Sequence, residues 1–218
     1  MQLTTRDRLL DAAEELFATH GYDGASLRDI AGVAKVPFGL ATYYFGTKEE
    51  LFRQVVARRA DEHIGEMTAA LDATVTHAAP GPPAIEELVR AFFAPMVEKL
   101  SQRGPGWRNY MQLLARAANI KQEQAFLKPF QQLYDPVRVR FVDIAATIYP
   151  LAPREHVLWA SHFLNAAIIQ FIAGEGSIDR LSGGHCRAND LDGIMRTMVP
   201  YFSGGFRALL ESATQGEN

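Results

Sequence analysis

The 218-residue sequence predicts an all-α protein of about nine helices. Apolar residues recur at the i, i+3, i+4 spacing of a helix along nearly every long segment, and the alternating patterns of half-buried strands are almost absent. Hydrophobic residues make up 48% of the chain and charged residues 22%, which excludes an intrinsically disordered protein. A chain of this length can bury a sizeable core without disulfides or metals.

The first predicted helix is bounded by a capping box and a glycine. Thr4 and Asp7 stand three residues apart, so that the side chain of each can accept a hydrogen bond from the backbone N–H of the other. Gly21 suits the C-terminal end, because glycine accepts the left-handed backbone often found there. Between these signals lies an apolar stripe that consists of Leu9, Leu10, Ala13, Leu16 and Phe17.

Two more capping boxes predict the helices that follow. Ser26 with Asp29 opens a short helix, and Thr47 with Glu50 opens a long helix that runs from residue 48 into the seventies. Another short helix is predicted between them at about residues 37–44. It begins with a proline, which has no backbone N–H. The first N–H groups of a helix have no partner within the helix, so proline costs no hydrogen bond at that position.

Proline and glycine divide the rest of the chain. Pro136 is expected to kink a long helix, because a proline inside a helix removes a hydrogen bond and clashes with the preceding turn. A Gly/Ser-rich loop is predicted for residues 174–187. The helices predicted in this region are 85–100, 107–118, 123–149, 154–173 and 191–210.

The net charge of −3 is distributed unevenly along the chain. Residues 1–60 hold eight basic and eight acidic residues and sum to zero. Within residues 26–48, the three cations Arg28, Lys35 and Lys48 are opposed by Asp29 alone, which gives +2. This is a local basic bias and not a basic domain.

Cysteine usage and hydropathy predict a cytoplasmic protein. Cys186 is the only cysteine, so no intrachain disulfide can form. The N-terminal residues carry charges throughout and contain no apolar segment of the kind found in signal peptides. The most apolar stretch, residues 157–173, is interrupted by His162, Asn165 and Gln170 and is predicted to be too short and too polar to span a bilayer. We therefore expect no membrane partner.

Residues 26–45 have the pattern of a helix-turn-helix, in which two short helices are separated by a tight turn. The second helix of this motif enters the major groove of DNA, which is about 12 Å wide, while the first helix braces it. Lys48 begins the next helix, where its ammonium and the backbone N–H groups can both meet a phosphate. Tyr44 and Phe45 are expected in the core, with Tyr43 facing outward. The predicted core of the motif is Leu27, Ile30, Ala31, Val36 and Phe45.

Residues 4–55 resemble the DNA-binding domain of the TetR family of bacterial transcription regulators. The resemblance is carried by Arg8-Leu-Leu-Asp-Ala-Ala-Glu-Glu-Leu-Phe17, Gly21-Tyr, Ser26-Leu-Arg-Asp-Ile-Ala31, Tyr43-Tyr-Phe-Gly-Thr-Lys48 and Glu50-Leu-Phe52. It implies a helix-turn-helix domain at residues 1–50 and an effector-binding and dimerisation domain at residues 51–218. The DNA contacts that it implies are Ser26, Arg28, Phe38, Leu40, Thr42, Tyr43 and Lys48.

Three positions depart from the pattern of the family. Lys35 stands where the turn usually has glycine, so that either this lysine is left-handed or the turn differs. Pro37 replaces the usual Ser or Thr cap of the recognition helix, and Thr42 replaces a tyrosine. The resulting reading face is unusually apolar and suits contact with thymine methyl groups.

Residues 109–116, 158–167 and 198–207 resemble fatty-acid-responsive members of the same family. This implies a homodimeric repressor that binds a palindromic double-stranded operator, with helices 154–173 and 191–210 pairing between subunits. The aromatic and Met side chains of residues 85–100, 107–118 and 124–149 predict a small apolar effector. The resemblance supports a fatty-acyl compound, while Trp107 and the Phe residues leave an aromatic compound open. We expect no cofactor. The residues expected to bind the effector are Phe92, Met96, Trp107, Met111, Arg116, Tyr134, His162 and Asn165.

Simpler explanations remain open for these effector residues. Aromatic and Met side chains of this kind are needed in any helical core. Arg116 can form an internal salt bridge or lie along the surface, and His162 and Asn165 can face a dimer partner or a backbone group.

An enzyme and a helical protein-interaction scaffold, both without DNA binding, are the alternatives. The six histidines are scattered with no HExxH pair, and no GxGxxG, Walker or GxSxG sequence occurs. Cys186 beside His185 lacks a group that would orient a base. We therefore assign no catalytic and no metal-binding residues.

Overall fold

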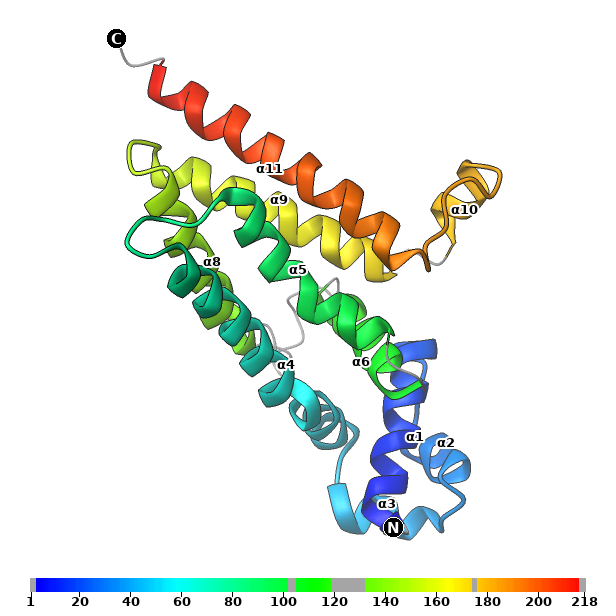
Figure 1. Ribbon diagram of the computed structural model, residues 1–218. Helices are drawn as coiled ribbons and strands as arrows, with labels where there is room; N and C mark the ends of the chain where they lie inside the picture. Colours follow the sequence, from blue (N-terminus) through cyan, green and yellow to red (C-terminus); the bar gives the residue numbers. More distant parts are fainter. Residues whose placement is uncertain (1–2, 102–104, 119–131, 174–175, 216–218) are drawn as a thin grey trace. The chain divides into compact units, whose positions relative to one another are not determined.

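The computed structural model describes residues 3–101, 105–118, 132–173 and 176–215, which contain ten helices and no strands (Figure 1). The predicted all-α class is confirmed. The helices are α1 (Thr5–His20), α2 (Leu27–Val33), α3 (Phe38–Phe45), α4 (Lys48–Ala78), α5 (Ile85–Ser101), α6 (Pro105–Ala118), α8 (Asp135–Ile148), α9 (Arg154–Ala173), α10 (Ser177–Leu181) and α11 (Leu191–Gln215).

The described residues pack as two compact units. The first unit comprises Met1–Glu62 and Gln102–Leu133, and the second comprises His63–Ser101 and Tyr134–Asn218. The first unit extends beyond residues 1–50, because the beginning of α4 and the whole of α6 pack on the core of α1. α6 contributes Leu113 and Ala117 to that core, and the Tyr110 hydroxyl donates to the carbonyl oxygen of Val56 at 3.0 Å.

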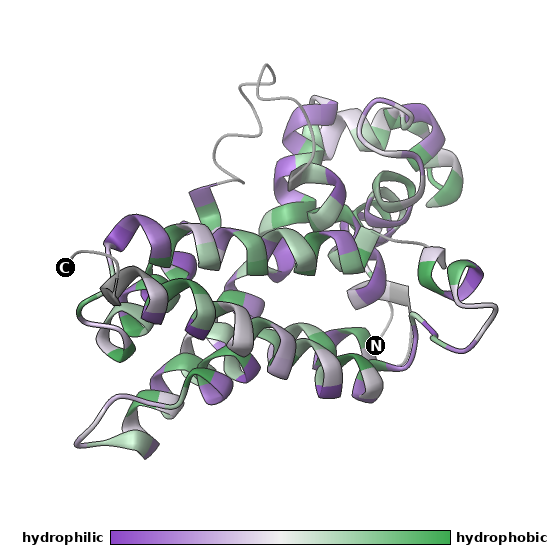
Figure 2. Ribbon diagram, turned by 90° about the horizontal axis from the view of Figure 1, so that it is seen from above, coloured by the Kyte–Doolittle hydropathy of each residue, from purple (hydrophilic) through white to green (hydrophobic). Residues whose placement is uncertain are grey.

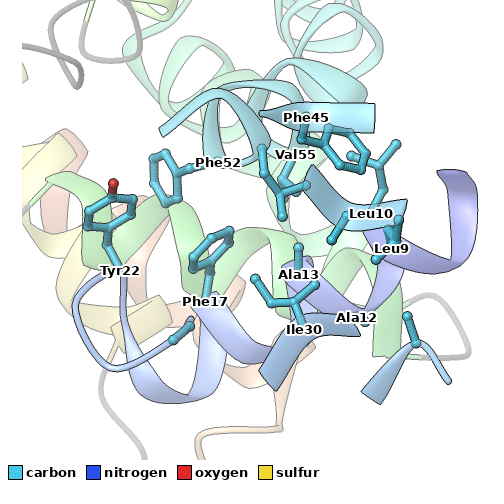
Figure 3. Packing of buried hydrophobic residues seen from close by; sticks show 14 of the residues in the cluster. Leu9, Leu10, Ala12, Ala13, Phe17, Tyr22, Ile30, Phe45, Phe52 and Val55 are labelled. Atoms are coloured by element: carbon cyan, nitrogen blue, oxygen red, sulfur yellow. The ribbon is translucent and has the colours of Figure 1, made fainter. Parts of the chain in front are cut away.

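Three aromatic rings lie at the centre of the first unit (Figure 3). Phe17 from α1 meets the edge of Phe52 from α4 at 5.1 Å and stacks on Tyr22 at 5.9 Å between ring centroids. Ile30 from α2 and Phe45 from α3 are buried in the same cluster. The predicted three-helix core is therefore present, and α4 completes it.

The second unit is built from α5, α8, α9 and α11 together with residues 63–78 of α4. α11 packs against both α5 and α9, and α8 packs against the same two helices. Phe92 and Phe141 have ring centroids 4.7 Å apart, and Phe206 lies 5.9 Å from Phe141. Hydrophobic and hydrophilic residues are interspersed along these helices (Figure 2).

Two predictions about helix limits are wrong. α8 begins at Asp135 after a turn at Tyr134, so Pro136 lies in the first turn of a helix and does not kink a longer one. A proline is tolerated there because the first N–H groups of a helix have no internal partner. Residues 119–131 of the predicted 123–149 helix lie outside the described residues. The loop predicted at 174–187 contains the five-residue helix α10, which is too short to show a periodic pattern.

α9 also corrects the expectation that this stretch is too short for a membrane span. At 20 residues and a mean hydropathy of 1.3, α9 meets the length and composition requirement, and it is the one described helix that does so. Only 22% of the most apolar 18-residue stretch of α9 is buried within the chain. The large apolar side chains of α9 that remain exposed are Leu158, Trp159 and Phe163.

Candidate nucleic-acid interface

The two helices of the helix-turn-helix are held by local capping and by the shared core. The backbone N–H of Asp29 donates to Ser26 Oγ at 3.2 Å, and the backbone N–H of Ser26 donates to Asp29 Oδ2 at 3.2 Å. The predicted capping box of α2 is thus confirmed. On α3, Ala41 and Phe45 are buried against α1 and α2. The exposed side chains on the other faces of α3 include the four predicted DNA contacts Phe38, Leu40, Thr42 and Tyr43.

Tyr43 is 79% exposed and Phe45 is buried, as predicted, but Tyr44 is 39% exposed and does not belong to the core. Successive residues of a helix are turned by about 100°, so residue 44 lies on the flank between an outward and an inward position. The Tyr44 ring meets the Tyr43 ring edge-on at 5.3 Å. The exposed aromatic surface of α3 is therefore larger than the sequence predicted.

The turn between α2 and α3 contains a left-handed lysine. Lys35 has φ 55°, which confirms the first of the two alternatives that the sequence left open. One guanidinium nitrogen, Arg8 Nη2 from α1, donates to the carbonyl oxygen of Ala34 at 2.5 Å and to that of Lys35 at 2.9 Å. Sequence reasoning placed Arg8 in the motif but assigned it no contact, because its partners lie 26 and 27 residues further along the chain.

Lys48 is the first residue of α4 and is already oriented by the chain. Its ammonium donates to the carbonyl oxygen of Tyr22 at 3.1 Å and lies 4.1 Å from the centroid of the Tyr22 ring. Burial and the neighbouring carboxylate of Glu49 raise the pKa of the Tyr22 phenol, so the ring remains neutral. On the other side of the motif, the Arg28 guanidinium lies 5.7 Å from the Phe38 ring and connects α2 to α3.

A buried ion pair connects α1 to α4 within the first unit. Arg59 Nε donates to Glu14 Oε2 at 3.0 Å, and the Arg59 guanidinium lies 5.0 Å from the Trp107 ring. Burial raises the pKa of Glu14 although the Arg59 guanidinium opposes this shift. A Cβ atom at Gly106 would lie 2.6 Å from Arg59 Nη2, so a larger residue there would force the Arg59 guanidinium to shift. Trp107, a predicted effector residue, thus packs on an ion pair in this unit.

Both parts of the chain match models of one protein family. Residues 9–55 match the N-terminal family described as bacterial regulatory proteins, tetR family. Residues 90–205, just over half of the chain, match the tetracyclin repressor-like C-terminal domain. The chain belongs to the TetR family.

Curated proteins similar to this TetR-family chain are transcription factors by name. The HTH-type transcriptional repressor Rv3405c of Mycobacterium tuberculosis is 27% identical over 197 residues, which cover 88% of each chain. The HTH-type transcriptional repressor NicS of Pseudomonas putida is 40% identical over 60 residues, covering 28% of this chain and 26% of NicS. The protein is therefore a TetR-type transcriptional regulator and not an enzyme.

Solved structures show the same fold at low sequence identity. The ketosteroid transcriptional regulator KstR2 of Mycobacterium tuberculosis is 17% identical with a TM-score of 0.64, covering 94% of this chain and 96% of that one. The fatty acid degradation regulator FadR of Bacillus halodurans is 15% identical with a TM-score of 0.62, covering 95% and 98%. TetR regulators bind DNA and act as dimers with small-molecule ligands.

The residues predicted to bind an effector are divided between the two units of this TetR regulator. Met111 is buried in the first unit, beside Trp107, and Arg116 in the same helix is exposed. In the second unit His162 is exposed and lies 5.9 Å from the Trp159 ring, while Asn165 is half-buried. The predicted effector residues that are buried in the second unit are Phe92, Met96 and Tyr134.

Two polar pairs near these residues were missed by sequence reasoning. His63 is buried, and its Nδ1 lies 3.0 Å from the hydroxyl oxygen of Tyr134. Lys99 is buried as well, and its ammonium donates to Glu66 Oε1 at 2.7 Å. Lys99 follows Met96 by three residues on α5, so both can lie on one helix face. A lone His or Lys in an apolar helix carries no sequence signal for such a partner.

Proposed function

We propose that two copies of this regulator bind a palindromic operator in double-stranded DNA and repress transcription from it in the cytoplasm. The observation that carries the proposal is the exposed face of α3, whose opposite side is fixed in the core of α1, α2 and α4. A helix held in this way can enter a major groove without rearranging. Two such helices in a dimer should lie about 34 Å apart, or a multiple of that distance.

The contacts divide by chemistry into those that position the protein and those that read sequence. Ser26, Arg28, Tyr43 and Lys48 carry hydroxyl or cationic groups that suit phosphates. Lys48 donates one of its three protons to Tyr22, which leaves two donors and the full charge for a phosphate. The side chains that we assign to base reading are Phe38, Leu40 and Thr42, which suit thymine methyl groups.

The test is a gel shift with DNA fragments that flank the protein's own gene. We expect one fragment to bind with nanomolar affinity, and a footprint on it to cover two inverted half-sites. The double variant Leu40→Ala, Thr42→Ala should still bind all fragments weakly but should no longer prefer one of them. A wild-type protein that binds every fragment equally at low salt would contradict the operator proposal.

The exposed apolar side chains of α9 and α11 support a dimer interface on these helices. Leu158, Trp159 and Phe163 on α9 are exposed, and Tyr201 on α11 is 76% exposed. α9 and α11 are in contact within the second unit, so their exposed side chains can form one surface. Large exposed apolar side chains on two neighbouring helices are typical of an interaction site, and we propose a second copy of the chain as its occupant.

We place the effector site in the second unit, near Phe92, Met96 and Tyr134. The surrounding side chains are mainly aromatic and aliphatic, which favours a fatty-acyl or aromatic compound over a sugar, a phosphate or a metal ion. We assign the His63–Tyr134 and Lys99–Glu66 pairs to the polar end group of the effector, because Tyr134 belongs to the first pair and Lys99 follows Met96 by three residues on α5. KstR2 and FadR, which share the fold, are named for ketosteroid and fatty-acid regulation, and this is consistent with an apolar effector.

The effector proposal is tested by titrating fatty acids, acyl thioesters and aromatic acids against the protein–operator complex. An effector changes operator affinity only if it binds the DNA-bound and free conformations unequally. We expect one of these classes to release the DNA, and Phe92→Ala to weaken that release while operator affinity without effector stays unchanged. Release by a phosphorylated sugar or a metal ion, with no response to apolar compounds, would contradict the proposal.

A further inference from the structure

We propose that Arg8 is a positioning residue for DNA recognition, which holds the turn before α3 in the left-handed conformation of Lys35. This inference rests on the proposed DNA binding through α3. Arg8 is not among the DNA contacts assigned above. Its guanidinium instead donates to two consecutive carbonyl oxygens, those of Ala34 and Lys35, at 2.5 and 2.9 Å.

The turn needs such a contact because its residues conflict with its backbone. A lysine with φ 55° brings its Cβ close to the backbone, a conformation that glycine adopts freely and other residues adopt rarely. The carbonyl groups at the end of α2 also lack helical partners and carry partial negative charge. A guanidinium on two of these oxygens satisfies them and opposes the charge, so it favours this turn over other conformations of the lysine.

The position of the turn determines where α3 begins. The backbone N–H of Val36 donates to the carbonyl oxygen of Ala31 at 3.0 Å, and that of Leu40 donates to Pro37 at 3.0 Å. The first bond ties the turn to α2, and the second forms the first turn of α3 directly after it. Arg8 itself is anchored in α1, where the adjacent Leu9 is fully buried in the core. A change in the turn would therefore move the reading face relative to α1.

The experiment is a double-mutant cycle of Arg8→Ala and Lys35→Gly. Two quantities are measured for each variant: the hydrogen-exchange rates of the Lys35 and Val36 amides in the free protein, and the Kd for the operator. With Lys35 present, we expect Arg8→Ala to raise both the exchange rates and the Kd by about tenfold or more, as for loss of a charged hydrogen bond. With glycine at position 35, the same change should alter either quantity by less than about threefold, because the strained residue is gone.

Two further variants separate positioning from loss of charge and from unfolding. Arg53→Ala removes one cation from the first unit, where Arg53 pairs only with Glu50 among the contacts described, and should leave turn exchange unchanged. Arg8→Lys keeps the charge and a donor, and should recover part of the loss of operator affinity. Amide exchange of Phe17 and Leu51, which are buried in the core of the first unit, reports whether a variant remains folded.

An equal effect of Arg8→Ala with lysine and with glycine at position 35 would overturn the proposal. So would normal exchange at Lys35 and Val36 after Arg8→Ala in a folded protein. If the wild-type protein bound no operator, the proposed function would fail, and the exchange measurements on free protein would still decide whether Arg8 holds the turn.

Discussion

Phe163→Glu should separate the dimer that we propose into monomers. Phe163 lies on α9 and is 55% exposed. A phenylalanine buries roughly 200 Å² when fully enclosed, so the exposed part offers about 110 Å² in each subunit. Burial of both copies at about 25 cal/mol per Å² stabilises the dimer by about 5 kcal/mol. Losing this contribution should raise the dimer dissociation constant more than a thousandfold, and the new carboxylate should oppose association further.

Sedimentation equilibrium between about 0.1 and 50 µM measures this change directly, with far-UV circular dichroism to confirm that the helices persist. Leu151→Glu is the matched control, since Leu151 is 81% exposed but lies between α8 and α9. The control should sediment as the wild type does. The reasoning is refuted if Phe163→Glu has the wild-type dissociation constant, or if the wild type itself is monomeric at micromolar concentration.

Three further predictions concern the first unit. Lys48→Ala should weaken binding to the operator and to non-specific DNA by the same factor. It should also lower the slope of log binding constant against log salt concentration by about one, because one phosphate contact is lost. An unchanged slope would show that Lys48 does not contact a phosphate. Tyr43→Phe should weaken both modes several-fold at an unchanged slope, because it loses a hydrogen bond and no charge. Burial raises the pKa of Glu14, so the folded state holds its proton more tightly than the unfolded state does. The stability that this contributes is present below the ordinary pKa of about 4.3 and is lost as the pH rises through the higher folded value. In urea denaturation, the free energy of unfolding of Glu14→Gln should therefore rise relative to that of the wild type between pH 4 and 7. A difference between the two proteins that does not change with pH would contradict the raised pKa of Glu14.

The sequence alone determined the features whose causes lie within a few residues. The capping boxes at Thr4 and Ser26 place the starts of α1 and α2, because a cap needs only a side chain three positions from the backbone group it satisfies. The helical spacing of residues 37–45 predicted that Tyr43 is exposed and Phe45 is buried, and the structure confirms both. A lysine where the family usually has glycine left two alternatives, a left-handed residue or a different turn, and the structure shows the left-handed residue. These local signals predicted the helix-turn-helix, and the resemblance of residues 4–55 to known sequences added its family.

The tertiary structure decided everything that depends on residues far apart in the chain. Periodicity says that one side of a helix is apolar, but it does not say which helix will cover that side. For this reason the packing of α6 on α1, the contact of Arg8 with the turn and the burial of Lys99 beside Glu66 could not be predicted. The same limit explains why Trp107, which was expected to line an effector site, packs on the Glu14–Arg59 pair. Side-chain partners are chosen when the helices assemble, since only then does burial leave each polar group in need of a specific neighbour.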